Sequence, residues 1–364
     1  MHIIGAALVG LAMVLASSAA PFAATLDEMA GQMILVGFRG DGPADASVKA
    51  VTKLIAQGRI GGVMYLKTNV KSLAAVRAMN KGFLAASPDL PPFIALDQEG
   101  GSIERLTRDV GFAEIPSARA VAATMSPDEA ERLYTNLAGR LAHLGFNLNF
   151  GPVVDLEINP DNPIIARYGR AYGKSAQVVA EFAEAFVKGH RAGGVLTALK
   201  HFPGHGSSRA DSHEGFVDIT ATWRRSELEP YRTLIADGLV DMVMAGHLYH
   251  ADFAQGRQDK APASLSPVWV GQVLRDQLGF SGVVVTDDME MKAIRSNFSF
   301  KEAIERAVIA GDDILLYSNT ADYHIGLADE IRAVLVARAK ADPAFAARLK
   351  QSYERILALK NRLD

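Results

Sequence analysis

The sequence predicts an α/β fold, a single-domain (β/α)8 barrel of the TIM type. Three observations support this prediction: eight short apolar runs recur along the chain, segments with helical spacing separate them, and polar residues directly follow several of the runs. Strands that alternate with helices indicate βαβ units and a parallel sheet. Eight such strands fit a closed barrel better than an open doubly wound sheet, even if the first strands are irregular.

The length and composition of the chain restrict its class. A length of 364 residues often means two domains, but α/β barrels of about 250 residues or more form single domains. The net charge is −3 and no run of Lys and Arg interleaved with aromatic residues occurs, so we expect no nucleic-acid partner. The absence of cysteine excludes disulfides, thiolate metal sites and cysteine nucleophiles.

The first 24 residues resemble a secretory signal peptide. They contain no Lys, Arg, Asp or Glu, and an apolar stretch from Ile3 to Leu15 leads into small residues that end at Pro21. We therefore predict a signal peptide at residues 1–24, a barrel domain at residues 25–364, and export to the periplasm or cell surface. The alternative is an uncleaved membrane anchor, since about 20 apolar residues can span a bilayer.

Short apolar runs mark the strands, and longer amphipathic segments between them mark the helices. Helical spacing is clear at Asp128–Leu144 and Ala176–Ala192, and Pro343–Leu363 is expected to form a last helix outside the barrel. No glycine-rich phosphate-binding pattern follows any strand, which disfavours a dinucleotide-binding fold. The predicted strands are Met33–Val36, Gly62–Tyr65, Phe93–Leu96, Asn147–Phe150, Leu196–Leu199, Met242–Ala245, Val283–Thr286 and Ile314–Tyr317.

Polar side chains gather where the predicted strands end. Asp97 follows the third strand, Lys200 and His201 the fifth, His247 the sixth, and Asp287 the seventh. In a (β/α)8 barrel the active site lies at the carboxyl ends of the strands. We therefore expect these side chains to meet at one end of the barrel.

The segment after the fifth strand holds three of the nine histidines, His201, His205 and His213. Pro203 and Gly204 between the first two exclude a helical zinc motif. A metal site carried by the loop, and histidines that serve only its backbone, remain alternatives. We favour an acid/base histidine, because Asp211 and His213 flank one residue and an extended turn would let the carboxylate orient the imidazole.

Asp287 and Asp288 follow the β-branched run Val283–Thr286. An aspartate at the mouth of a barrel suits attack on an anomeric carbon, because the transition state has positive oxocarbenium character. The alternative is a helix cap, a role that we assign to Asp288 because Asp287 is nearer the strand end.

Asp97 begins a third group, in which Gly100 and Gly101 permit a tight turn close to a ligand and Arg105 follows eight residues after Asp97. Asp97 would accept hydrogen bonds from sugar hydroxyls, and a purely structural Asp97–Arg105 pair is the alternative.

Taken together, these motifs resemble the single-domain β-N-acetylhexosaminidases of glycoside hydrolase family 3. The resemblance covers about residues 31–313 and rests on Asp97–Gly101, Lys200–Gly206, Asp211–His213 and Thr286–Met289, which occur in the family's order and spacing. It implies a (β/α) barrel, with Asp287 as nucleophile and His213 as acid/base partnered by Asp211. The sugar-binding residues that it implies are Asp97, Arg105, Arg170, Lys200 and His201.

The resemblance also implies a substrate. A chain with the Asp-x-His loop and no further domain is expected to be a retaining exo-β-N-acetylglucosaminidase that removes terminal GlcNAc from peptidoglycan fragments. It would bind small GlcNAc-containing glycosides and need no metal or cofactor. A β-glucosidase, another exo-β-glycosidase of the family, or a non-catalytic sugar-binding barrel are the alternatives. The aglycone, the oligomeric state, and water or phosphate as acceptor stay open.

Three positions depart from the family pattern. Ser102 stands where an arginine is common, Glu290 replaces a usual small residue, and Glu214-Gly215 follows the Asp-x-His pair. None of these departures removes a group with an expected catalytic role.

Overall fold

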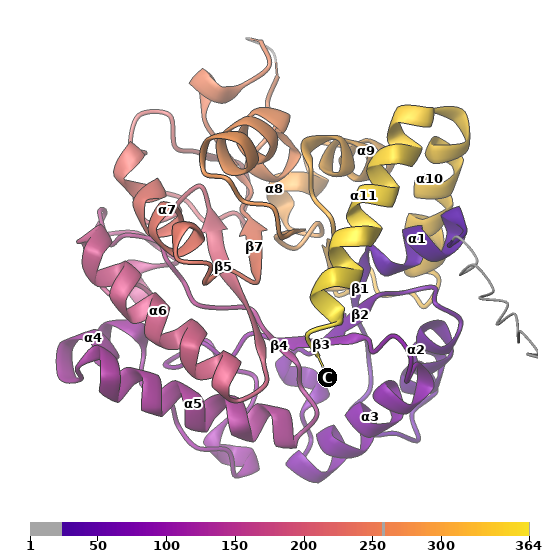
Figure 1. Ribbon diagram of the computed structural model, residues 1–364, viewed down its shortest axis with the longest axis horizontal. Coiled ribbons are helices and arrows are strands. Elements are labelled where there is room, and N and C mark those ends of the chain that lie inside the picture. Colours follow the sequence, from indigo (N-terminus) through magenta and orange to yellow (C-terminus); the bar gives the residue numbers. More distant parts are fainter. Residues whose placement is uncertain (1–23, 257–258, 364) are drawn as a thin grey trace, which may run out of the picture.

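Eight parallel strands form the centre of the computed structural model, which describes residues 24–256 and 259–363 (Figure 1). The predicted signal peptide lies almost entirely outside these residues. The strands pair in the order β10-β1-β2-β3-β4-β5-β7-β9. A parallel bridge between Val285 and Ile314 joins the two ends of this order, so the sheet closes into a barrel. The strands are β1 (Ile34–Gly37), β2 (Gly62–Met64), β3 (Phe93–Leu96), β4 (Leu148–Asn149), β5 (Leu196–Phe202), β7 (Met242–Ala245), β9 (Val283–Thr286) and β10 (Leu315–Tyr317).

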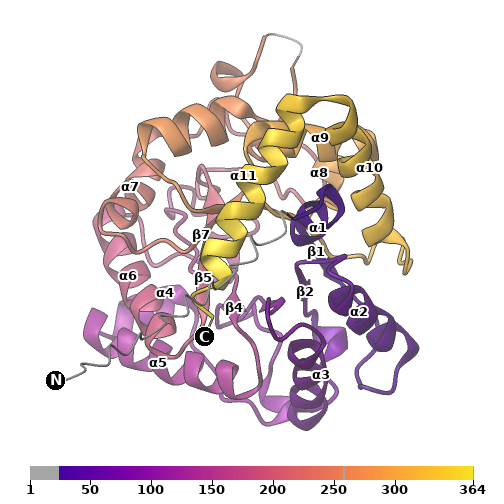
Figure 2. The same ribbon diagram turned by 45° about the vertical axis from the view of Figure 1, so that its right-hand side comes forward.

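The predicted fold is confirmed, and each predicted strand matches an observed one within a few residues. Helices surround the strands, as the two views in Figures 1 and 2 show. They are α1 (Leu26–Gln32), α2 (Ala46–Ala56), α3 (Leu73–Ala86), α4 (Ala118–Thr124), α5 (Pro127–His143), α6 (Ala176–Ala192), α7 (Glu229–Ala236), α8 (Lys292–Arg295), α9 (Phe300–Ala310), α10 (Leu327–Ala341) and α11 (Pro343–Lys360).

Helix α5 shows how local sequence forms these elements. Ser126 accepts a hydrogen bond from the Glu129 N–H, the Glu129 carboxylate accepts one from the Ser126 N–H, and Pro127 occupies the first helical position. The apolar face of α5 then packs on α6, where the ring of Tyr134 lies 4.6 Å from that of Phe186.

Strand β5 extends beyond its prediction. Lys200 and His201 lie inside the strand, whereas the sequence placed them after it. The reason is an irregular ladder: the register between β5 and β7 shifts between Leu199 and Phe202, and the segment after β4 pairs with Lys200 through Val153. The peptide bond between Lys200 and His201 is cis.

Two features had no signal in the sequence. A small parallel sheet joins β6 (Val217–Asp218) to β8 (Leu248–Tyr249), and Val268–Gln277 forms a π-helix. Strands of two residues are too short to produce a recognisable apolar run.

Helix α11 runs across the barrel in front of the strands in Figure 2. Its Arg348 and Arg355 pair with Asp313, just before β10, and the buried Lys360 ammonium donates to the Gln32 side chain and the Gly61 carbonyl, just before β1 and β2. These contacts fasten the last helix across the amino ends of the strands.

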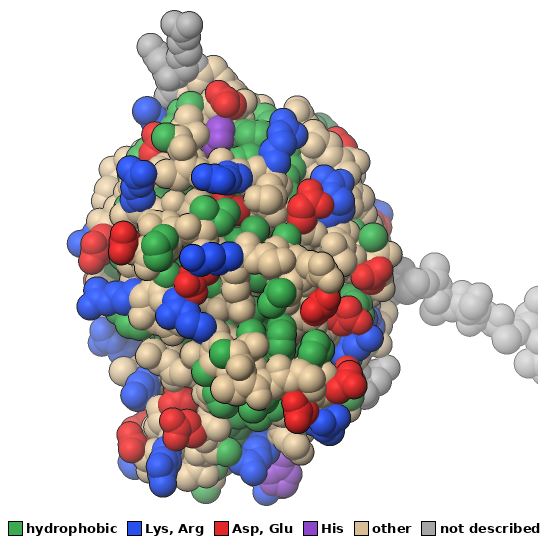
Figure 3. All heavy atoms as spheres, turned by 90° about the vertical axis from the view of Figure 1, so that its left-hand side faces the viewer, with side chains coloured by type: hydrophobic (Ala, Val, Ile, Leu, Met, Phe, Trp, Pro, Cys, Tyr) green, Lys and Arg blue, Asp and Glu red, His purple; other side chains and the backbone are tan. Residues whose placement is uncertain are grey.

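On the face of the molecule at the left of Figure 1, positive and negative side chains are interspersed (Figure 3). Within residues 24–256 and 259–363, none of the helices combines the length and the apolar character that a membrane span requires.

Candidate active site

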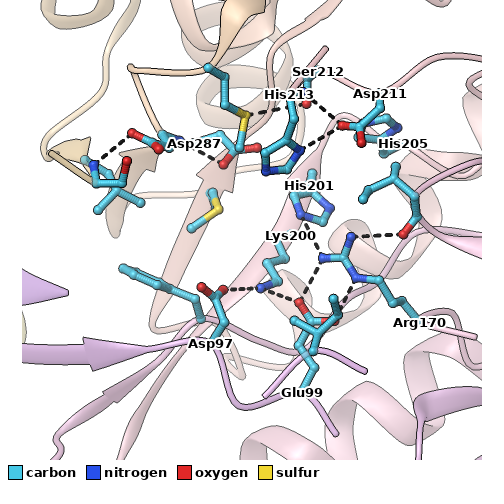
Figure 4. A pocket seen from close by; sticks show the side chains of 18 of the residues that line it. Asp97, Glu99, Arg170, Lys200, His201, His205, Asp211, Ser212, His213 and Asp287 are labelled. Carbon is cyan, nitrogen blue, oxygen red and sulfur yellow. Dashed lines mark hydrogen bonds and ion pairs between the residues drawn. The ribbon is translucent and has the colours of Figure 1, made fainter. Parts of the chain in front are cut away.

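The predicted site residues line one cavity of about 570 Å³ at the carboxyl ends of the strands. Figure 4 shows how the charged side chains point into it from several strands. All eight predicted residues line this cavity: Asp97, Arg105, Arg170, Lys200, His201, Asp211, His213 and Asp287.

A chain of alternating charges forms one wall. The Lys200 ammonium, which is buried, donates to Asp97 Oδ1 at 2.7 Å and lies 2.6 Å from Glu99 Oε1. Arg170 holds both oxygens of Glu99, at 2.8 and 2.9 Å, and Arg105 donates to Asp97 Oδ2 at 2.8 Å. The Asp97–Arg105 pair therefore exists, and it belongs to the wall of the cavity.

Burial alone would raise the pKa of the Asp97 carboxyl, but Lys200 and Arg105 hold that pKa well below its usual range. Burial likewise opposes ionisation of Glu99, yet Arg170 and Lys200 lower its pKa to about 2. Both carboxylates are therefore charged and fixed before a ligand arrives. A polar ligand would meet oriented acceptors and donors with little reorganisation.

The turn after β3 places Arg105. The Gln98 side chain accepts from the backbone N–H groups of Arg105 and Leu106, both at 3.0 Å. Gly100 has a φ of 102°, and a Cβ there would lie 2.4 Å from the Pro116 carbonyl oxygen. Only glycine fits this close approach.

His201 is oriented by a buried carboxylate that the sequence analysis missed. Its Nδ1 lies 2.8 Å from Asp155 Oδ2, and since a carboxylate can only accept, Nδ1 carries the proton. Nε2 lies 3.4 Å from the Arg170 guanidinium. Asp155 also accepts from the His205 N–H at 2.7 Å, so one carboxylate fixes both histidines.

Asp287 follows β9 and is 7% exposed. Its N–H donates to the Ala245 carbonyl, and its Oδ1 accepts from the Asp288 N–H at 2.8 Å. Burial would raise its pKa, but His247, His201 and His213 together lower that pKa below the usual value. Asp287 is thus an anion at neutral pH, in the state that a nucleophile requires.

His213 and Asp211 lie together as predicted. Asp211 Oδ1 lies 2.8 Å from His213 Nδ1 and also accepts the His213 N–H at 2.9 Å. The hydrogen bond to Asp211, aided by the charge of Asp287, raises the pKa of His213 above its usual value. With Nδ1 held by Asp211, Nε2 is the nitrogen available for proton transfer.

The loop that carries His213 contacts the segment that follows Asp287. The Ala293 N–H donates to the Ser212 carbonyl at 3.2 Å, and the Ser212 hydroxyl lies 3.6 Å from the Met291 sulfur. The His213 imidazole and Asp287 therefore line one cavity, and the segments that carry them are in direct contact.

Buried polar groups fix the root of the same loop. The Ser207 hydroxyl donates to Glu227 at 2.6 Å, and the Asn162 amide donates to the His205 carbonyl at 2.8 Å. Glu227 is 0% exposed, and burial raises its pKa to about 8. Sequence reasoning found neither Asn162 nor Glu227, because both lie outside the motifs and are distant from the loop along the chain.

The prediction that Asp288 caps a helix is wrong. Helix α8 begins only at Lys292, with Met291 at its N-cap. Asp288 instead accepts from the N–H groups of Ser318 and Glu290, because the chain turns toward β10 before the helix starts.

Glu99 stood inside a motif singled out from the sequence but had no role assigned to it. Glu99 lies two residues after Asp97, directly after β3, and this position could have indicated that it belongs to the site. In the described part of the chain, no three His, Cys, Asp or Glu side chains are grouped so that they could hold a metal ion.

A charged wall, a buried anionic aspartate and an imidazole–carboxylate pair at the carboxyl ends of a (β/α)8 barrel fit the site of a glycoside hydrolase. Residues 25–359 match the family described as the glycosyl hydrolase family 3 N terminal domain. The chain belongs to glycosyl hydrolase family 3, which confirms the resemblance inferred from its motifs.

Its relatives include β-hexosaminidases. One, from Stenotrophomonas maltophilia strain R551-3, is 34% identical over 78% of this chain and 82% of its own length. Beta-hexosaminidase A of Pseudoalteromonas piscicida is 31% identical over 95% of this chain, which spans only 63% of that relative. Among solved structures, the β-N-acetylhexosaminidase of Beutenbergia cavernae aligns with a TM-score of 0.80 at 31% identity, covering 93% of this chain and 99% of that one.

A family 3 β-N-acetylglucosaminidase structure from Paenibacillus sp. FPU-7 aligns with a TM-score of 0.83 at 33% identity. The alignment covers 94% of this chain and 63% of that one. The present chain is therefore similar both to relatives of about its own length and to the larger part of longer ones.

Proposed function

We propose that this chain is a retaining exo-β-N-acetylglucosaminidase, with Asp287 as nucleophile and His213 as acid/base. The observation that carries the proposal is the convergence of an anionic Asp287 and the Asp211–His213 pair on one cavity. The β-hexosaminidase relatives support the substrate class.

The reaction would proceed in two steps. In the first, Asp287 attacks C1 of the sugar while Nε2 of His213 donates a proton to the departing oxygen, so that a glycosyl ester forms as the aglycone leaves. In the second, His213 takes a proton from water, the water oxygen bonds to C1, and the ester bond to Asp287 breaks. The anomeric configuration is retained.

The charged wall would hold the non-reducing end of the sugar. Asp97 lies after β3, on the opposite side of the barrel from Asp287 after β9, so a sugar with C1 at Asp287 would direct its far hydroxyls toward Asp97 and Lys200. A closed wall at that end suits removal of a single terminal residue.

The test uses the purified chain without its first 24 residues and two nitrophenyl substrates, the β-N-acetylglucosaminide and the β-glucoside. We expect turnover of the first, with the β-anomer appearing first in proton NMR. Preference for the glucoside would favour a β-glucosidase, absence of turnover would favour a sugar-binding barrel, and initial release of the α-anomer would refute retention.

We further propose that the natural substrates are GlcNAc-containing peptidoglycan fragments and that the enzyme is exported. The apolar residues 1–24 support export. Fractionation of cells and N-terminal sequencing of the mature protein would test it, and a protein found with its first residues intact and membrane-bound would indicate an anchor.

A further inference from the structure

Glu290, three residues after Asp287, binds a segment of the cavity wall without lining the cavity itself. Its Oε2 accepts from the Ser318 hydroxyl at 2.9 Å and from the Thr320 N–H at 2.7 Å. Ser318 and Thr320 both line the cavity, immediately after β10.

Asp288 holds the same segment from its other side. Its Oδ1 accepts from the Ser318 N–H at 2.9 Å and from the Glu290 N–H at 3.1 Å. The wall after β10 is thus tied to the segment of the nucleophile candidate by two carboxylates.

These contacts set the direction of a short hydrogen-bond chain. A carboxylate can only accept, so the single proton of the Ser318 hydroxyl points to Glu290. The oxygens of Ser318 and Thr320 lie 2.9 Å apart, and Thr320 must then be the donor between them. The Thr320 oxygen is left with lone pairs only, and it presents an acceptor at an exposed position of the wall.

Exposure places this acceptor nearer the mouth than the nucleophile candidate, because Thr320 is exposed whereas Asp287 is only 7% exposed. Val285 of β9 bridges Ile314 in parallel, so Asp287 lies beside Leu316 of β10, and Thr320 follows the end of that strand. A sugar with its C1 at Asp287 has its leaving group on the mouth side. Thr320 therefore flanks the leaving group, away from the charged wall that would hold the terminal sugar.

We propose that Glu290 is a positioning residue that, through Ser318, orients Thr320 as a hydrogen-bond acceptor for a hydroxyl of a sugar leaving group. The inference rests on the proposed function and adds a preference for saccharide over aryl leaving groups. An aryl group offers no hydroxyl to this acceptor.

The test measures kcat/KM on two substrates with the same terminal sugar, the β-1,4-linked dimer of GlcNAc and nitrophenyl β-N-acetylglucosaminide. The variants are Thr320→Val, Glu290→Ala and Glu290→Gln. Glu330→Ala is the matched control, because Glu330 contacts the same loop through His324 and lies outside the cavity. Inhibition by free GlcNAc reports binding of the terminal sugar alone.

We expect Thr320→Val and Glu290→Ala to lower the ratio of dimer to aryl kcat/KM by about three- to tenfold, the scale of one hydrogen bond. Glu290→Gln should keep the wild-type ratio, because its amide oxygen still accepts from the Thr320 N–H and the Ser318 hydroxyl. Glu330→Ala should also keep the wild-type ratio. Inhibition by GlcNAc should not change in any variant. If Glu290→Ala does not fold, Thr320→Val alone decides.

An unchanged ratio in Thr320→Val, an equal loss on both substrates, or a loss in Glu290→Gln as large as in Glu290→Ala would overturn the inference. Wild-type protein inactive on both substrates would refute the proposed function instead, and the inference with it.

Discussion

Asp211 holds His213 through two contacts of one carboxylate oxygen. Its Oδ1 lies 2.8 Å from the ring nitrogen Nδ1 of His213 and accepts the His213 backbone N–H at 2.9 Å. The His213 side chain is nevertheless 58% exposed. The imidazole is therefore oriented without being buried, and water can reach it while the nucleophile candidate beside it stays largely shielded.

Replacing His213 with Ala should lower kcat by roughly 10²–10⁴-fold, the usual contribution of general acid–base catalysis. Inhibition by GlcNAc should stay near the wild-type level, because the charged wall is untouched. His143→Ala, at an exposed histidine on α5, is the control. Wild-type turnover in His213→Ala would contradict the acid/base assignment.

The pH dependence of Asp211→Asn tests the pair directly. His213 must be protonated to act as an acid, and Asp211 raises its pKa, so kcat/KM of the wild type should fall on the alkaline side at a pH above 6.5. Loss of the carboxylate should move that limb to lower pH. If the alkaline limb stands at the same pH in both proteins, the titration of His213 does not cause it.

Asp287→Asn should abolish measurable turnover, by roughly 10⁴-fold or more, as removal of a nucleophile does in other hydrolases. Thermal unfolding would show whether the variant is folded, and GlcNAc should still bind. Hydrolysis within tenfold of the wild type would rule out Asp287 as the nucleophile.

Glu227 makes stability depend on pH. Burial raises its pKa from 4.5 to about 8, so the folded state keeps a proton that the unfolded state has lost between these values. Stability contributed by this residue is therefore full below about pH 4.5 and decreases as the pH rises toward 8. Glu227→Gln lacks this titration, and its Tm relative to the wild type should increase from pH 5 to pH 8. A constant difference would exclude the raised pKa.

Much of the barrel could be predicted because its strands are short apolar runs that end in polar residues. Strand β5 was underestimated, because Lys200 and His201 are polar yet point into the barrel, where other charges pair with them. The small β6–β8 sheet gave no pattern, since its strands have two residues each.

The motifs identified the residues of the cavity but not their supports. Asp155 and Glu227 act through partners 46 and 20 residues away, on His201 and Ser207. Spacing along the chain does not reveal such pairs, because the fold alone brings them together. The predicted role of Asp288 was wrong for a related reason: its partner Ser318 directly follows the neighbouring strand β10, 30 residues further along the chain.

The charged wall has a consequence for inhibitors. Asp97 and Glu99 are each engaged by cationic side chains. Asp287, among the described residues, has three histidines and the Asp288 N–H around its carboxylate and no Lys or Arg in an ion pair. The unbalanced negative charge therefore lies at the position proposed for C1. An inhibitor ring whose ammonium nitrogen replaces the anomeric carbon would gain attraction there. The same positive charge at the far hydroxyls would compete with the lysine and arginine already in place.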